Sequence, residues 1–222
     1  MKRQHKPYTD FVIEKIREAP AGCPIYIGDI AKELAGYYSI DAKKASAAAS
    51  VAIKRIIDND KVKGLRIFKK GVYYIANETP FGETGIDKEK LVYNKYIQNG
   101  EGYIGGFMIL YQIGLTTQIP RTKEIVTNAA KDCLRKDELL GVSIRPPKVA
   151  ITEENKEYLR TLDAIELMDK APVDVDHPYS ILANHIRNKE LKYDKMLALA
   201  DKYYSKSTIY RLAHTASAGG DA

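Results

Sequence analysis

Several classes of protein are ruled out by what this sequence lacks. The chain of 222 residues has only two cysteines, Cys23 and Cys133, which lie far apart and show no metal-ligand spacing. Two thiols cannot build a disulfide framework for a chain of this length, so we expect both to be reduced. No run approaches the roughly 20 apolar residues that cross a bilayer. The basic N-terminus also lacks the apolar region and cleavage site of a signal peptide. These absences predict a soluble, cytoplasmic protein with no membrane partner.

Signatures of catalysis are equally scarce. The nucleotidyltransferase fold needs a Gly-Ser pair followed by metal-holding aspartates, and this chain has no Gly-Ser dipeptide. Asp174, Asp176 and His177 lie close together, but Asp176 is more simply the cap of a helix that begins behind Pro178. No glutamate or cysteine completes a zinc site with His177 and His185. The sequence therefore predicts no catalytic site, no metal site and no cofactor.

What the chain does contain is an ordinary globular composition with an uneven charge. Hydrophobic residues make up 45% and charged residues 29%, which allows a buried core. The net charge is +6, and all of it lies in residues 1–78, which hold 15 Lys/Arg against 9 Asp/Glu. Residues 79–222 hold 20 of each sign. This asymmetry favours an N-terminal module that faces a polyanion, although a solvated basic surface explains the charge alone equally well.

Three helices are expected before residue 60. The segment "YTDFVIEKIREAP" places Phe11, Val12 and Ile16 on one stripe, with Thr9 as the N-cap. A second helix follows within residues 25–37. The third spans about residues 41–58, and its buried face comprises Ala45, Ala48, Ala49, Ala52, Ile53, Ile56 and Ile57.

The first turn of the third helix contains two cations, which is unusual for a helix N-terminus. Lys43 and Lys44 occupy its first turn, where the helix dipole disfavours a cation by roughly 0.3–1 kcal/mol. The pair is explained if this end faces phosphates or base edges, as the start of a recognition helix does. The outward face continues with Ser46, Ala47, Ser50 and Lys54. Small side chains let the backbone approach a groove wall, and hydroxyls can meet bases or phosphates. The alternative is an alanine-rich core helix with solvated lysines.

The segment "VKGLRIFKKGVYYIA", residues 62–76, predicts a two-stranded hairpin with a tight turn at Gly71. The apolar positions that would anchor it to the helices are Leu65, Ile67, Val72 and Tyr74. Arg66, Lys69 and Lys70 would then project toward a phosphate backbone, where contacts set affinity rather than sequence choice. Three helices followed by a basic ribbon have the order of a winged helix-turn-helix. Residues 1–78 are therefore predicted to form a DNA-binding domain.

A second module is expected beyond a linker at residues 79–90, which holds a proline, two glycines and several acidic residues. The alternative is that the early part of this linker packs on the wing. In the second module, residues 91–222, we expect helices around a small antiparallel sheet, with strands at "LTTQI", "KEIVTN", "GVSIR" and "KVAI". One helix is expected over about residues 87–98, and "GGFMILYQIG" is expected to form a short buried helix that Gly114 ends. A helical tail follows Thr152 and frays near residue 216. Glycines 102, 105 and 106 fit no phosphate-loop spacing and favour close packing instead. The predicted fold class is α+β.

Three segments resemble the AbiEi-like antitoxins of bacterial abortive-infection (type IV toxin–antitoxin) systems. The central segment "GYIGGFMILYQIGLTTQIPRTKEIVTN" resembles that family's signature, in which a helix ends in Gly-Leu-Thr-Thr-Gln-x-Pro before a strand that ends in Thr-Asn. The wing "RIFKKGVYYI" and the tail "LALADKYYSKSTIYRLAHT" are also similar to the family's wing and closing helical hairpin. The likeness runs from about Tyr8 to His214. One departure is that Tyr204 and Ser205 follow the Lys-Tyr pair, where the family commonly has proline.

The resemblance implies two jobs for this chain. The winged helix would bind inverted repeats in its own promoter, as double-stranded DNA, and repress the operon. The second module, an antitoxin-type α+β domain, would antagonise a neighbouring nucleotidyltransferase-like toxin without a stable complex. Two-fold operators are usual for this fold, so a dimer or paired monomers on DNA are expected.

Two other readings stay open at this point. The chain could be a transcriptional regulator whose second module senses a ligand or dimerises, with no toxin partner. The other is a nucleic-acid-modifying enzyme, which would need Asp174 and Asp176 to hold a metal.

Overall fold

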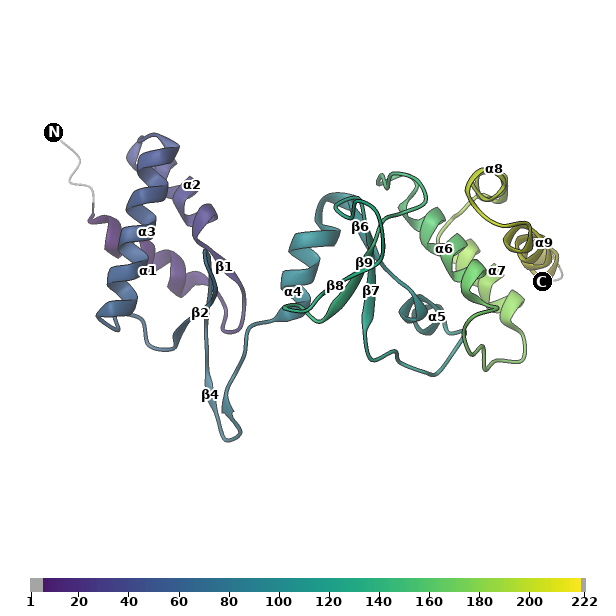
Figure 1. Cartoon of the computed structure of the whole chain (residues 1–222), viewed down its shortest axis with the longest axis horizontal. Helices are drawn as coiled ribbons and strands as arrows, with labels where there is room; N and C mark the ends of the chain where they lie inside the picture. The colour runs from purple at the N-terminus through teal and green to yellow at the C-terminus, as the bar shows by residue number, and fades with distance from the viewer. Residues whose placement is uncertain (1–5, 221–222) are drawn as a thin grey trace. The chain divides into compact units, whose positions relative to one another are not determined.

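The computed structural model describes residues 6–220. The chain has the α+β fold that the sequence predicts, and it divides into two compact units, Met1–Leu91 and Val92–Ala222 (Figure 1). Within residues 6–220, no helix combines the length and the apolar character that crossing a membrane requires.

Three helices and a three-stranded sheet build the first unit. The helices are α1 (Tyr8–Glu18), α2 (Ile27–Tyr38) and α3 (Ala42–Asp58). The strands are β1 (Ile25–Tyr26), β2 (Leu65–Lys69) and β3 (Val72–Ile75), in the order β1-β3-β2. The sequence predicted the helices and the β2–β3 hairpin but missed β1, which is only two residues long and pairs antiparallel with β3. The order of elements is that of a winged helix-turn-helix.

Helix α3 packs against α1 and α2 through small side chains. Ala45 and Ala49 are completely buried, and Ala52 is nearly so. Because alanine adds so little bulk, the neighbouring helices can approach the α3 backbone closely. The apolar cluster around this face includes Phe11, Val12 and Ile16 of α1, Ile30 and Leu34 of α2, and Ile53 and Ile56 of α3. The predicted inner faces of α1 and α3 are therefore confirmed.

Two local expectations in this unit are wrong. Helix α1 begins at Tyr8 behind Pro7, one residue before Thr9, and no side chain caps it. In the wing, Ile67 is 59% exposed, and Tyr73 and Ile75 pack on the core where the sequence analysis placed Ile67 and Tyr74. The pairing of β2 with β3 shifts between Ile67 and Lys69, and such a bulge bends a strand and changes which side chains face the core.

A second hairpin follows the wing directly and projects from the first unit (Figure 1). Strands β4 (Glu78–Thr79) and β5 (Gly82–Glu83) pair antiparallel around a tight turn. The hairpin occupies part of the predicted linker, residues 79–90. The backbone N–H of Asp87 then donates to the carbonyl of Gly22 at 2.8 Å. Glu83, in the early part of the predicted linker, pairs with Arg66 of the wing, which is the alternative that the sequence left open. We call residues 77–84 the arm.

The second unit combines a four-stranded sheet with short and long helices. The helical segment at the boundary of the two units, expected as one helix over residues 87–98, is divided into α4 (Lys88–Val92), the π-helical η1 (Tyr93–Ile97) and the 3-10 turn η2 (Gln98–Gly100). The strands are β6 (Gly102–Gly105), β7 (Lys123–Thr127), β8 (Arg135–Asp137) and β9 (Val142–Arg145). The helices are α5 (Phe107–Ile113), α6 (Lys156–Leu167), α7 (Pro178–Asn188), α8 (Tyr193–Tyr203) and α9 (Lys206–Gly220).

The sheet of this unit is mixed, which corrects the expectation of an antiparallel sheet. The strand order is β6-β7-β9-β8, and β7 runs parallel to β9. After β7 the chain turns back to form the edge strand β8, and the β8–β9 hairpin then inserts β9 beside β7. Because β8 is antiparallel to β9, this insertion makes β9 run in the direction of β7.

Strand positions were predicted correctly for β7 and β9 and wrongly elsewhere. The segments "LTTQI" and "KVAI" form no strand, whereas β6 and β8 were not expected. In the first segment, the backbone N–H and the hydroxyl of Thr117 both donate to Asp174, so the backbone is satisfied by a loop carboxylate and not by a strand ladder. Helix α9 continues to Gly220, so the expected fraying from residue 216 is wrong as far as that residue; residues 221–222 lie outside the described part.

The central glycines serve packing, as predicted. A Cβ on Gly102 would collide with the carbonyl oxygen of Tyr96, and one on Gly105 would lie 2.6 Å from the Val126 side chain. The predicted helix stop at Gly114 is also confirmed, because this residue ends α5 in the left-handed conformation at φ 87°.

A buried polar network joins the sheet to the helices of the second unit. Asp163 on α6 is 2% exposed and accepts hydrogen bonds from Arg145 at 2.5 Å, Tyr103 at 2.7 Å and Tyr204 at 2.8 Å. Arg145 also donates to Glu124 at 2.8 Å. Burial, together with the neighbouring Asp163, raises the pKa of both tyrosines, so their phenols remain protonated donors. The network fixes β6, β9 and the α8–α9 connection on α6.

Replacing Asp163 by asparagine is expected to destabilise the second unit by about 3 kcal/mol, because Arg145 loses the buried charge that compensates it. Tyr204→Phe removes a single donor and is expected to cost about 1 kcal/mol. Urea unfolding followed by circular dichroism measures both. Tyr210→Phe, at a tyrosine that is 66% exposed, is the control and should unfold with the wild type. An Asp163→Asn variant with an unchanged transition would contradict this role for the network.

Candidate nucleic-acid interface

Helix α3 presents one continuous outward face opposite its buried alanines. Lys43, Ala47, Ser50 and Lys54 are all exposed and recur at intervals of four, three and four residues. This spacing places them on a single stripe of the helix. At a rise of 1.5 Å per residue, Lys43 and Lys54 lie about 16 Å apart along the axis. The stripe therefore carries a cation near each end and small side chains between them.

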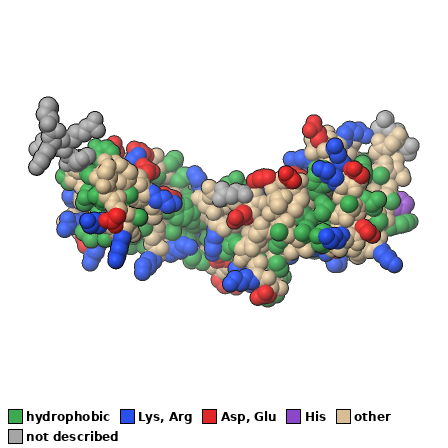
Figure 2. Space-filling model, turned by 90° about the horizontal axis from the view of Figure 1, so that it is seen from above, with side chains coloured by type: hydrophobic (Ala, Val, Ile, Leu, Met, Phe, Trp, Pro, Cys, Tyr) green, Lys and Arg blue, Asp and Glu red, His purple; other side chains and the backbone are tan. Residues whose placement is uncertain are grey.

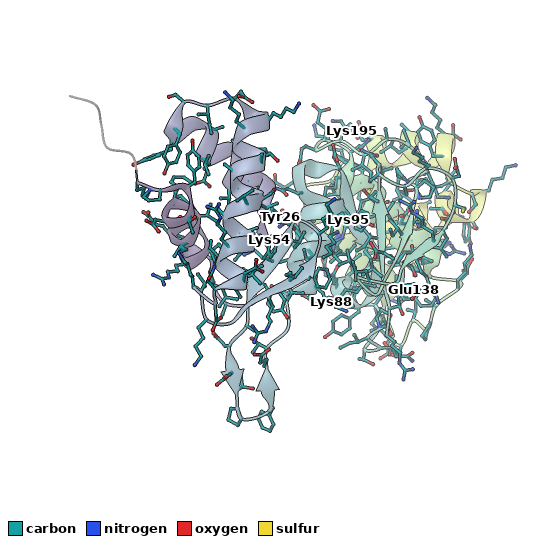
Figure 3. All side chains as sticks on the ribbon, turned by 60° about the vertical axis from the view of Figure 1, so that its left-hand side comes forward. Tyr26, Lys54, Lys88, Lys95, Glu138 and Lys195 are labelled. Carbon is teal, nitrogen blue, oxygen red and sulfur yellow. The ribbon has the colours of Figure 1, made fainter. Side chains whose placement is uncertain are left out.

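The flanking residues of the stripe are Lys44 and Ser46, both also exposed. Asp41 caps the helix, because its carboxylate accepts the backbone N–H of Lys44 at 2.9 Å, and it lies 3.9 Å from the ammonium of the same lysine. Asp41 therefore partly offsets the penalty that the dipole imposes on Lys44. Among the described residues, Lys43 and Lys54 form no ion pair, so both ammonium groups are free for an external anion. Figure 3 labels Lys54 on this helix.

The two serines of α3 are not equivalent. The hydroxyl of Ser50 donates to the carbonyl of Ser46 at 2.8 Å, one helical turn earlier. Its oxygen still has an acceptor position toward solvent. Ser50 is thus suited to accept a hydrogen bond from a ligand, for example from the amino group of a base.

The wing carries two unpaired cations at its tip. Lys69 and Lys70 are exposed, and neither forms an ion pair with a described residue. Gly71 turns the chain at φ 80°, as predicted, and its carbonyl accepts the backbone N–H of Ile27 at 3.1 Å. The tip is therefore fixed at the start of α2, whereas the lysine pair of α3 follows the end of α2. The twelve residues of α2 separate the two groups by about 18 Å along its axis.

Arg66, the third predicted cation of the wing, differs from the lysines. Its guanidinium makes a two-point ion pair with Glu83 of the arm. The hydrogen bond from Arg66 lowers the pKa of Glu83, so the carboxylate stays charged across the physiological range. The structure thus brings Arg66 to an internal partner and leaves Lys69 and Lys70 free. No local sequence signal indicates this pair, because the two residues are 17 positions apart and belong to different hairpins.

The surface of the first unit reflects this distribution. Figure 2 shows Lys and Arg side chains gathered along the lower edge of this unit, with fewer acidic side chains between them. A surface of this kind attracts a polyanion and raises its association rate. The nine residues predicted from sequence lie on two elements of the first unit, α3 and the wing. They are Lys43, Lys44, Ser46, Ala47, Ser50, Lys54, Arg66, Lys69 and Lys70.

The alternative sites considered from sequence have structural partners in the second unit. Asp174 accepts hydrogen bonds from Thr116 and Thr117, and the backbone and hydroxyl donors of Thr117 lower its pKa. His185 lies 3.3 Å from the Thr161 hydroxyl, and burial lowers its pKa. Asp176 does not cap α7, whose N-cap is His177. Across residues 6–220, no group of three His, Cys, Asp or Glu side chains is placed to hold a metal ion.

Comparison with known proteins gives little further information. No protein-family model and no curated protein matches the chain. Among solved structures, the chain is similar to the RV2827C protein from Mycobacterium tuberculosis, with 13% sequence identity and a TM-score of 0.46. The alignment covers 99% of this chain and 79% of that chain. The similarity is too distant to transfer a residue role or an activity.

Lys43→Glu is expected to stabilise the first unit by about 0.3–1 kcal/mol, because it replaces an unpaired cation by an anion in the first turn of α3. Thermal unfolding of the full chain measures this change. Lys69→Glu, which reverses an unpaired charge outside any helix, is the control and should leave the melting temperature unchanged. A Lys43→Glu variant that melts below the wild type would show that Lys43 carries no stability cost.

Proposed function

We propose that this chain is a DNA-binding autorepressor and an antitoxin that antagonises a nucleotidyltransferase-like toxin. The observation that carries the DNA half is the outward stripe of α3, where free lysines flank small side chains on a helix packed through its opposite face. The sequence resemblance to AbiEi-like antitoxins supports the second half. No catalytic role is assigned to any residue.

In the proposed complex, α3 enters the major groove of double-stranded DNA. Ala47 and Ser50 let the helix backbone approach the base edges, and Lys43 and Lys54 meet phosphates or acceptor atoms of guanine. An N-terminal turn that carries Lys43 and Lys44 suits this role, because the start of a recognition helix is the part that contacts bases.

The wing supplies the second set of contacts. Lys69 and Lys70 lie about 18 Å along α2 from the lysine pair of α3, which corresponds to roughly five base pairs of DNA. They would bind phosphates outside the groove that α3 occupies. Such contacts add affinity without sequence preference. Arg66 contributes less in this arrangement, because a phosphate must compete with Glu83 for its guanidinium.

The antitoxin half rests on the resemblance of the central segment, the wing and the tail. No residue is assigned to toxin antagonism. The competing proposal is a regulator whose second unit senses a ligand or dimerises. A nucleotidyltransferase-like reading frame beside this gene would favour the antitoxin, and its absence would favour the regulator.

Replacing Lys43 and Lys44 together by alanine is expected to weaken binding to the chain's own promoter DNA. The loss of two phosphate contacts also flattens the dependence of log K on log salt by about 1.8. The double replacement of Lys69 and Lys70 should have a similar effect on the slope, whereas Arg66→Ala should have less. Gel shifts at several salt concentrations measure both quantities.

The matched control replaces Lys131 and Lys136, two exposed lysines of the second unit, and removes the same charge. It should bind DNA as the wild type does. Equal losses of DNA affinity in the control and in the Lys43/Lys44 variant would show that binding depends only on the net charge of the chain. If the Lys43/Lys44 variant and the Lys69/Lys70 variant both bound DNA with wild-type affinity, the DNA half of the proposal would be refuted.

Co-expression with the neighbouring gene is expected to restore growth, because the chain antagonises the encoded toxin. The Lys43/Lys44 alanine variant should rescue growth as well as the wild type does, but a promoter reporter should become derepressed. The reason is that DNA binding and toxin antagonism are proposed for different units. Absence of rescue by the wild type would reject the antitoxin half and leave the regulator. Loss of rescue in the variant would show that the jobs are not separable.

A further inference from the structure

The arm is a small, pre-organised hairpin. The backbone N–H of Thr84 donates to the carbonyl of Asn77 at 2.9 Å, and the Thr84 hydroxyl accepts the N–H of Asn77 at 2.8 Å. Near the tip, the hydroxyl of Thr79 donates to the carbonyl of Gly82 at 2.7 Å. At its base, Arg66 of the wing holds Glu83. An element fixed in this way loses little conformational entropy when it binds a partner.

The tip of the arm presents a fully exposed aromatic ring. Phe81 is 100% exposed and follows Pro80 in the turn. The turn itself does not require phenylalanine, since polar residues such as Asp, Asn or Ser are preferred there. Burying such a side chain in a partner yields about 1.5–3 kcal/mol. A rigid, exposed aromatic is the usual anchor of a protein interface.

The charge of the arm indicates what kind of surface would receive it. Glu78 and Glu83 are directly opposite each other across the two strands, and like charges at such positions destabilise a hairpin. Arg66 compensates Glu83, whereas Glu78 is exposed and forms no ion pair with a described residue. The arm, residues 77–84, holds two acidic residues and no cation, in contrast to the +6 balance of residues 1–78.

This charge argues against contact with nucleic acid and for contact with a basic protein surface. A phosphate backbone would repel Glu78, so insertion of Phe81 between bases would be opposed by charge. The chain itself supplies a complementary surface, because its excess of cations lies in the first unit. Within one copy, the ion pair between Arg66 and Glu83 shows that a cation of the first unit can lie beside the arm.

We propose that the arm mediates self-association: Phe81 packs on the first unit of a second copy, and Glu78 meets a cation there. Neither Glu78 nor Phe81 belongs to α3 or the wing, so failure of the proposed DNA binding would leave this proposal standing. If each copy docks its arm on the other, both contacts are made within a dimer and no larger assembly is required.

Sedimentation equilibrium of the full chain from about 1 to 300 μM tests the proposal, at low and high salt. The wild type is expected to associate, and more weakly as salt rises. Phe81→Ser should weaken association at least about tenfold and keep the salt dependence, because the ion pair remains. Glu78→Gln should weaken association and remove most of the salt dependence. Phe81 is fully exposed, so its replacement should leave the melting temperature unchanged.

Ile119→Ser provides the matched control, since Ile119 is a 64% exposed apolar residue of the second unit. It should associate as the wild type does. A wild type that remains monomeric over the whole range overturns the proposal, as does a Phe81→Ser variant that associates with unchanged affinity. A Phe81→Ser variant that associates normally but loses promoter affinity would place the arm on DNA and overturn it equally.

Discussion

Close packing through alanine is the constraint on which the first unit depends. Ala45, Ala49 and Ala52 allow α3 to lie directly against its neighbours, so the helix is held through backbone proximity and a few isoleucines. The outward face then has no part in folding and can carry lysines that a stability-driven sequence would avoid. The proposed DNA contacts therefore lie on the face of α3 that takes no part in packing.

The same division explains what could be predicted from the sequence. The period of α3, the glycine turn of the wing and the stop at Gly114 depend on neighbouring residues, and these local signals were sufficient. Strand β1 is two residues long and exists only because β3 lies beside it. The parallel pairing of β7 with β9 follows from where the β8–β9 hairpin inserts, which no local pattern encodes.

Polar partners distant in sequence account for the remaining differences. Arg66 has the composition of a phosphate ligand but is held by Glu83, so a basic residue in a basic stretch is not necessarily free. The Asp163 network joins tyrosines and an arginine from positions 18 to 60 residues away, and each appeared as an unremarkable core or surface residue in the sequence. Asp174 lay in a segment examined for metal binding and instead caps the loop at Thr117. The roles of these residues follow from their burial and their position in the fold, which the residue type alone does not indicate.

The orientation of α3 on DNA is the central claim, and a tethered cleavage reagent tests it directly. An iron chelate attached to Ala47→Cys, in a chain whose Cys23 and Cys133 are replaced by serine, would generate radicals at the outward face of α3. The account predicts cleavage confined to a few neighbouring base pairs of the promoter, around one major-groove segment per bound copy. The same chelate on Ala213→Cys, exposed on α9, serves as the reference. Equal or diffuse cleavage from both positions would contradict the account.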